Sequence, residues 1–229
     1  MPTKSFYKHR PLQTKASSPK AFKHPVDVNK HRRVVGDLPN YTNSNTQPFH
    51  SLNEHDWLLI LDVEVNEFHA TAFHAQPETF PFRRNGIAYR YTPDIRTTFQ
   101  QGWTVFQEVK PDEHAASQEF EERWEYCTEV LADAGHELEL ILVSDIRREP
   151  RYTNVMTLQR ARHIMLVPEI TLPIDDVLGD GGQLPIGRIS AAFQNRIFAR
   201  QVIWALILRK HLTIDLNEPL SEDSLVRKV

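Results

Sequence analysis

Three side chains in one short region of the sequence have the chemistry of a metal-dependent hydrolase. Asp94 follows a proline, and Glu108 and Lys110 lie two positions apart in the largely apolar run 103–110. Because alternate residues of a strand point to the same face, a strand here would place Glu108 and Lys110 side by side. Carboxylates are preferred ligands of Mg²⁺, which assists phosphodiester hydrolysis by polarising the phosphate and activating water. An ammonium group beside them can orient that water or stabilise the charged transition state.

The spacing of these residues, Pro93-Asp94 followed by Glu108-Val109-Lys110, resembles that of the PD-(D/E)xK nucleases. The resemblance implies that Asp94, Glu108 and the backbone carbonyl of Val109 bind Mg²⁺, with Mn²⁺ as a substitute, and that Lys110 is catalytic. Taken alone, a Glu-x-Lys pair is also common as a solvated pair on a strand. The motif alone therefore does not distinguish a nuclease site from such a surface pair.

The flanking segments extend the resemblance in their order along the chain. A segment with Glu54, the pair Gln76-Pro77, the segment Tyr91–Asp94 and the segment Glu108–Pro111 follow one another. This order resembles the TnsA family, the endonuclease subunits of heteromeric transposases, over roughly residues 48–229. The resemblance implies that Glu54 is a further catalytic acid and metal ligand, and that Gln76 supports the sheet beside the site.

Glu54 also has a purely structural explanation. Ser51 and Glu54 have the spacing of a capping box, in which a serine begins a helix and a glutamate three residues later satisfies a free backbone N–H. The helix that they would begin is expected to run to about Asp62. The two roles are compatible, and Asp62, Glu64 and Glu67 are rival acids upstream of the motif.

The resemblance implies an activity and a set of partners. The chain would hydrolyse the non-transferred (5′) strand of double-stranded DNA at transposon ends, while a TnsB-like transposase cuts and joins the other strand. A TnsC-like AAA+ ATPase would contact the C-terminal part, and the expected location is the bacterial cytoplasm, associated with the nucleoid when bound. Two alternatives stay open: a non-catalytic adaptor with a nuclease fold, and a stand-alone restriction-like or repair-like endonuclease.

The charge of the chain is unevenly distributed. The net charge is −3, yet residues 1–40 contain six lysines and three arginines against Asp27 and Asp37. A basic arm on an acidic body indicates an anionic partner, and DNA is the expected one; the alternative is a solvated tail without a partner. The candidate DNA-binding residues are Lys4, Lys8, Arg10, Lys15, Lys20, Lys23, Lys30, Arg32 and Arg33.

The order of the remaining patterns predicts the fold class. Helix–strand–strand–strand–helix–strand predicts an α/β fold with a mixed sheet flanked by helices, which the resemblance implies is restriction-endonuclease-like. The expected organisation is a basic, mostly extended arm over 1–47, the nuclease domain over 48–149 and a C-terminal domain over 150–229. Short helices and a β tail predict that this last domain is small, mainly helical and winged-helix-like, suited to docking the ATPase or DNA.

Individual elements follow from local signals. Asn85-Gly86 predicts a hairpin turn, and the strands Ile87–Tyr91 and Trp103–Val109 are expected to pair with each other. The spacing of apolar residues over 112–134 predicts a helix that buries Cys127 as a small filler. The single cysteine excludes an internal disulfide framework, and no apolar stretch is long enough to predict a membrane span.

Overall fold

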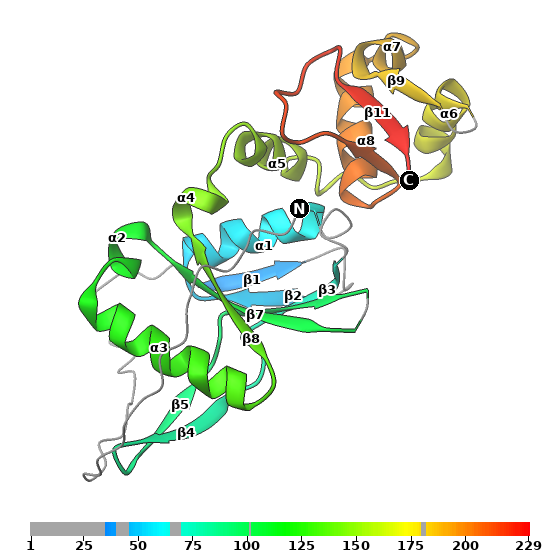
Figure 1. The fold of residues 1–229 in the computed structure, drawn as a ribbon. Helices are drawn as coiled ribbons and strands as arrows, with labels where there is room; N and C mark the ends of the chain where they lie inside the picture. Colours follow the sequence, from blue (N-terminus) through cyan, green and yellow to red (C-terminus); the bar gives the residue numbers. More distant parts are fainter. Residues whose placement is uncertain (1–34, 40–45, 65–69, 101, 180–181) are drawn as a thin grey trace.

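A four-stranded mixed sheet forms the centre of the N-terminal part of the molecule (Figure 1). The computed structural model describes residues 35–39, 46–64, 70–100, 102–179 and 182–229. The sheet has the order β3-β6-β7-β8, with strands Ala70–Ala75, Ile95–Phe99, Thr104–Lys110 and Glu137–Leu142. β7 pairs with β6 antiparallel and with β8 parallel. The predicted α/β class, with a mixed sheet flanked by helices, is confirmed.

The two faces of β7 contribute to different parts of the core. Val109 belongs to a large apolar cluster that includes α1 (Leu52–Glu64), whereas Phe106 belongs to a smaller one with Cys127 of α3 (Gln118–Asp133). Since side chains alternate along a strand, Glu108 and Lys110 point to the same face as Phe106. Glu108 and Lys110, two of the four predicted catalytic side chains, therefore lie on the α3 side of the sheet.

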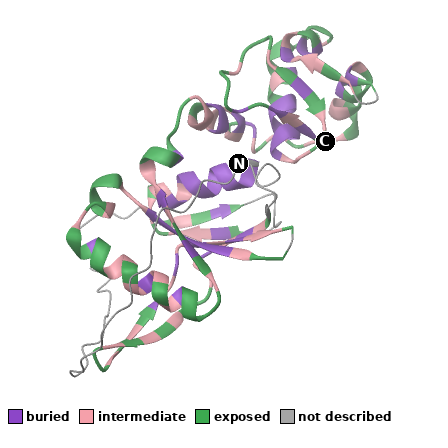
Figure 2. Cartoon of the chain, in the orientation of Figure 1, coloured by how far each residue is buried: buried purple, intermediate pink, exposed green. Residues whose placement is uncertain are grey.

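α1 is buried along most of its length, because positions 56–63 are all buried (Figure 2). One side of the helix packs on the sheet, where the indole N–H of Trp57 donates to Gln107 at 3.1 Å. Its other side packs on α5 (Arg151–Gln159) and α8 (Arg196–Leu208). A helix that is apolar on all sides is expected where both faces are covered.

The C-terminal part combines helices with a small antiparallel sheet. Its other elements are α6 (Pro168–Leu178), α7 (Ile186–Ala191) and a three-stranded sheet of order β10-β11-β9, with strands Leu212–Ile214, Leu225–Lys228 and Gln183–Pro185. The apolar cluster of α1 continues without interruption into this part, as far as Val226. The expected boundary between residues 149 and 150 stays a prediction, but the core does not divide there.

Polar contacts also tie α1 to the C-terminal part. Arg162 forms an ion pair with Asp62 at 2.8 Å, and the Lys210 ammonium donates to the backbone carbonyls of Asp62 and Val63. Tyr152 donates its hydroxyl proton to Asp56 at 2.9 Å. A lysine at carbonyls near the end of a helix satisfies acceptors that lack partners within it.

The expected pairing of Ile87–Tyr91 with Trp103–Val109 was wrong. The first segment forms β5 (Ile87–Tyr91) and pairs with β4 (Phe80–Arg84) as a hairpin, which confirms the Asn85-Gly86 turn. The partner of β7 is instead β6, a strand that begins directly after Asp94. The predicted helix over 112–134 is confirmed in outline but divides into α2 (Asp112–Ala115) and α3, and a short α4 (Val143–Ile146) follows β8.

Part of the region expected to be an arm belongs to the fold. β1 (Gly36–Pro39) pairs antiparallel with β2 (Thr46–Phe49), and Leu38 and Gln47 are buried. The nine candidate DNA-binding residues, Lys4 to Arg33, lie outside the described residues. Within the described part of the chain, no helix is both long and apolar enough to cross a membrane.

Candidate active site

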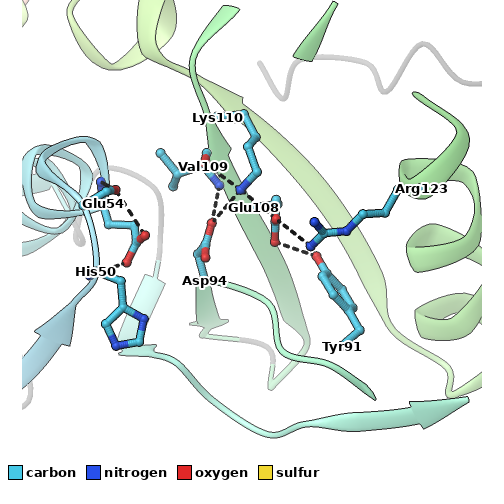
Figure 3. Close-up of polar contacts among 9 residues, drawn as sticks. His50, Glu54, Tyr91, Asp94, Glu108, Val109, Lys110 and Arg123 are labelled. Carbon is cyan, nitrogen blue, oxygen red and sulfur yellow. Dashed lines mark hydrogen bonds and ion pairs between the residues drawn. The ribbon is translucent and has the colours of Figure 1, made fainter. Parts of the chain in front are cut away.

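Asp94 is held by backbone contacts from two neighbouring segments. Its Oδ2 accepts a hydrogen bond from the backbone N–H of Val109 at 2.8 Å (Figure 3). Its backbone carbonyl accepts one from the backbone N–H of Gln76 at 2.7 Å. Gln76 has a φ of 45°, in the left-handed region, directly after β3. The predicted supporting residue thus acts through its backbone, which fixes the segment that carries Asp94.

The Lys110 ammonium contacts three of the four groups predicted to bind a metal. Its Nζ lies 2.7 Å from Glu108 Oε1, 3.5 Å from Asp94 Oδ2 and 3.1 Å from the Val109 carbonyl oxygen. β7 supplies Glu108, Val109 and Lys110, while Asp94 comes from the turn before β6. The arrangement predicted from the spacing of these residues is therefore present, and its acceptors converge on one nitrogen.

Two further side chains contact Glu108 and were missed in the sequence. The Tyr91 hydroxyl donates to Glu108 Oε2 at 2.8 Å, and Arg123 Nη2 lies 3.8 Å from Glu108 Oε1 (Figure 3). Tyr91 is buried and ends β5, whereas Arg123 is the single basic residue of the otherwise acidic α3. The sequence marks Arg123 as a lone arginine in an acidic helix, but it does not indicate the contact with Glu108.

Glu54 makes the contacts of a capping residue and also faces the site. Ser51 Oγ accepts from the Glu54 backbone N–H at 3.1 Å, while the Glu54 carboxylate accepts from the His50 backbone N–H at 2.8 Å. Ser51 therefore begins α1, as predicted. Figure 3 shows the Glu54 carboxylate turned toward Asp94. Its charge is close enough to raise the pKa of Asp94.

The site contains more negative than positive charge. Burial is the largest cause of a raised pKa at Asp94, which reaches about 7, and the charge of Glu108 is the next. Burial alone would lower the pKa of Lys110, but the charges of Glu108 and Asp94 outweigh it and raise this pKa. The ammonium thus stays protonated near neutral pH, yet it does not fully compensate the buried carboxylates.

The donor set fits a hard divalent cation in its chemistry. Asp94, Glu108 and the Val109 carbonyl offer only oxygen atoms, which Mg²⁺ and Mn²⁺ prefer. Burial and the charge of Glu108 raise the pKa of Asp94, so a bound cation would favour its ionised form. Among the described residues, however, no three His, Cys, Asp or Glu side chains already form a metal-binding group. Lys110 Nζ contacts the same three oxygens, so ammonium and cation would compete for them.

Asp62, the one rival acid whose side chain the structure describes, does not reach this site. Asp62 is fully buried and pairs with Arg162, at the opposite end of α1 from Glu54. The side chain of Glu64 and all of Glu67 lie outside the description. Cys127 is buried, as predicted, and burial raises the pKa of its thiol to about 11, which excludes a thiolate near neutral pH.

The comparisons with known proteins add no family assignment. No protein-family model matches the sequence, and no similar protein was found among curated proteins.

Proposed function

We propose that this chain is a Mg²⁺-dependent DNA endonuclease, the subunit of a heteromeric transposase that hydrolyses the non-transferred strand at transposon ends. The observation that carries the hydrolase assignment is the convergence of Asp94 and Glu108 on Lys110, at 3.5 and 2.7 Å from its Nζ. Two buried carboxylates beside one ammonium, at the two central strands of a mixed sheet, suit phosphodiester hydrolysis. The transposase assignment rests on the order of segments that resembles TnsA.

Each residue has a distinct part in this proposal. Asp94, Glu108 and the Val109 carbonyl hold the cation, which when bound polarises the phosphate and activates water. A protonated lysine donates hydrogen bonds but accepts none, so Lys110 orients the attacking water or stabilises the negative charge of the transition state. Tyr91 is a positioning residue, because its hydroxyl donates to the Glu108 carboxylate and holds that group in place.

The order of helices and strands supports the proposed nuclease fold. The element order α1, β3, β6, β7, α3, β8, with β4 and β5 as a separate hairpin, is that expected of a restriction-endonuclease-like core. We infer that α5 to α8 and the small sheet form the winged-helix-like part that docks a TnsC-like ATPase. A TnsB-like transposase is the second protein partner, in the bacterial cytoplasm.

The function is tested with purified chain, DNA carrying transposon ends, and the candidate transposase partner. The expected result is cleavage of one strand that needs Mg²⁺ and the partner, and that is absent when Ca²⁺ replaces Mg²⁺. Cleavage of naked DNA by the chain alone would instead favour the stand-alone nuclease. Excision that proceeds equally with wild-type protein and Asp94→Asn would favour the non-catalytic adaptor.

Glu54→Gln separates the catalytic role of this residue from its capping role. Glutamine keeps a side-chain oxygen that can accept the hydrogen bond of a capping box but removes the charge, so stability should change little while strand cleavage falls. The matched control is Ser51→Ala, which should cost about 1 kcal/mol of unfolding free energy and leave cleavage near normal. Urea unfolding and a single-turnover cleavage assay measure both. Equal cleavage by Glu54→Gln and wild type would restrict Glu54 to capping.

Deletion of residues 1–34 is expected to weaken DNA binding in a salt-dependent way. This segment contains all nine basic residues of the predicted arm, and ends before Leu38, which is buried. Each phosphate that the arm neutralises contributes about −0.9 to the slope of log affinity against log salt. Fluorescence anisotropy with a short duplex at several salt concentrations measures that slope. An unchanged slope would show that the arm has no part in DNA binding.

A further inference from the structure

A two-stranded ribbon projects beside the candidate site and has no part in the chemistry described above. β4 and β5 pair only with each other, with Phe82 opposite Tyr89 and Pro81 opposite Arg90. Asn85 and Gly86 form the tip with φ values of 53° and 80°, the left-handed geometry of a tight hairpin turn. Figure 1 shows the ribbon alongside α3, apart from the central sheet.

The inner face of the ribbon is anchored on α3 and the core. The Arg84 guanidinium lies 3.3 Å from the centre of the Tyr126 ring, and Phe80 packs edge-on against Phe106, with ring centres 5.2 Å apart. Phe82 stacks on Tyr89 at 5.2 Å within the ribbon. These contacts hold the ribbon in one orientation, so its outer face is presented with little freedom to lose on binding.

The outer face is exposed and carries only positive charge. Its residues are Pro81, Arg83, Ala88 and Arg90, all exposed. Arg83 and Arg90 are diagonal neighbours in the register, and neither forms an ion pair with any described residue. No acidic residue occurs between Phe80 and Tyr91, whereas α3 on the inner side is rich in glutamate. The outer face therefore attracts an anionic partner, whereas the glutamates of α3 repel one on the inner side.

The ribbon is joined directly to the catalytic groups. β5 ends at Tyr91, whose hydroxyl donates to Glu108 at 2.8 Å, and Asp94 follows three residues later. A partner held on the ribbon is thus placed at a fixed position relative to Glu108 and Asp94. An exposed surface with this rigid connection is suited to positioning a long polyanion that passes the site.

We propose that the outer face of the β4–β5 ribbon binds the sugar-phosphate backbone of duplex DNA next to the cleaved strand. Duplex DNA is chosen as the partner on the strength of the function proposed above, together with charge complementarity. Guanidinium groups bind phosphate through two parallel hydrogen bonds, and neither Arg83 nor Arg90 has an internal ion-pair partner among the described residues to give up. Contacts of this kind fix register and orientation without reading sequence.

The test compares Arg83→Ala/Arg90→Ala with the control Arg160→Ala/Arg227→Ala in the full-length protein. Both pairs remove two exposed arginines. Of the control arginines, Arg160 directly follows α5 and Arg227 lies in β11. Binding of a fluorescent duplex is measured with Ca²⁺ in place of Mg²⁺, between about 50 and 200 mM salt. In the ribbon variant, the slope of log affinity against log salt concentration should be smaller in magnitude by about 1.8, because two phosphate contacts are removed at about 0.9 each. The control should keep the wild-type slope.

The outcomes separate the ribbon from the hydrolase assignment. An unchanged slope in the ribbon variant, an equal loss in the control, or no wild-type binding at low salt would each overturn the ribbon surface, even if strand cleavage is observed. A reduced slope in a protein that never cleaves DNA would support the ribbon and reject the nuclease. Arg83→Lys/Arg90→Lys keeps both charges, so it should retain the slope but bind less tightly. A slope as low as that of the alanine pair would contradict the proposal.

Discussion

Asp94→Asn is expected to reduce strand cleavage by at least about 100-fold, the effect of losing one electrostatic stabiliser of a transition state. Asparagine retains an oxygen that can accept from the Val109 N–H, now 2.8 Å from Asp94 Oδ2, so the local fold should persist. What disappears is the negative charge that holds a divalent cation. Single-turnover cleavage and calorimetric titration with Mn²⁺ measure the two effects, and both should be lost together.

Lys110→Met provides the contrast within the same site. The lysine ammonium lies 2.7 Å from Glu108 Oε1 and competes for the oxygens that would bind the cation. Removing it should leave Mn²⁺ affinity equal to or above that of the wild type, while cleavage is lost. Equal loss of Mn²⁺ affinity in Lys110→Met and Asp94→Asn would contradict the division of roles.

A stability measurement controls for misfolding of Asp94→Asn. Burial raises the pKa of Asp94 to about 7 in the folded protein, above the value of about 4 for an unfolded chain. The folded state therefore binds the proton more tightly, so this group favours folding at low pH and loses that contribution as pH rises from about 4 to about 7. Above pH 7 and without divalent cations, Asp94→Asn should melt at a higher temperature than wild type. A lower melting temperature would indicate disruption of the fold.

Arg162→Met is the substitution expected to destabilise the fold most. It leaves Asp62, whose side chain is 0% exposed, without the guanidinium that lies 2.8 Å away. Breaking a buried ion pair from one side costs about 3–5 kcal/mol, because a buried charge stays behind. Urea unfolding followed by fluorescence measures the loss.

Two controls test whether the stability lost in Arg162→Met comes from the buried charge of Asp62. The double substitution Asp62→Leu/Arg162→Met removes both charges and should recover much of the stability, since apolar replacements of buried pairs are often tolerated. Arg96→Met breaks the exposed pair with Glu78 at 2.9 Å and should cost less than about 1 kcal/mol. A loss in Arg162→Met no larger than that in Arg96→Met would show that the buried pair contributes little.

The part of the site that lies on one strand was accessible from the sequence. Glu108 and Lys110 share a face because strand side chains alternate, and Ser51 with Glu54 is a local capping pattern. Tyr91 and Arg123 were missed because their contacts with Glu108 join three separate elements. Nothing in the local sequence of α3 shows that Arg123 faces a carboxylate on β7.

The errors in the fold have similarly local causes. The turn chemistry of Asn85-Gly86 correctly indicated a hairpin, but not that the hairpin stands apart from the sheet. β6 was overlooked because Ile95–Phe99 is short and largely polar, although it is the strand that pairs with β7. α6 contains Pro173 within the helix, which disfavours a helix in a sequence pattern.

The burial of α1 has a mechanical consequence. One end of the helix carries Glu54, turned toward Asp94, and the other is held by Arg162 and Lys210 from the C-terminal part. A helix of 13 residues spans about 20 Å and bends little over that length. A displacement of the C-terminal elements along the axis of α1 would therefore also displace Glu54 relative to Asp94.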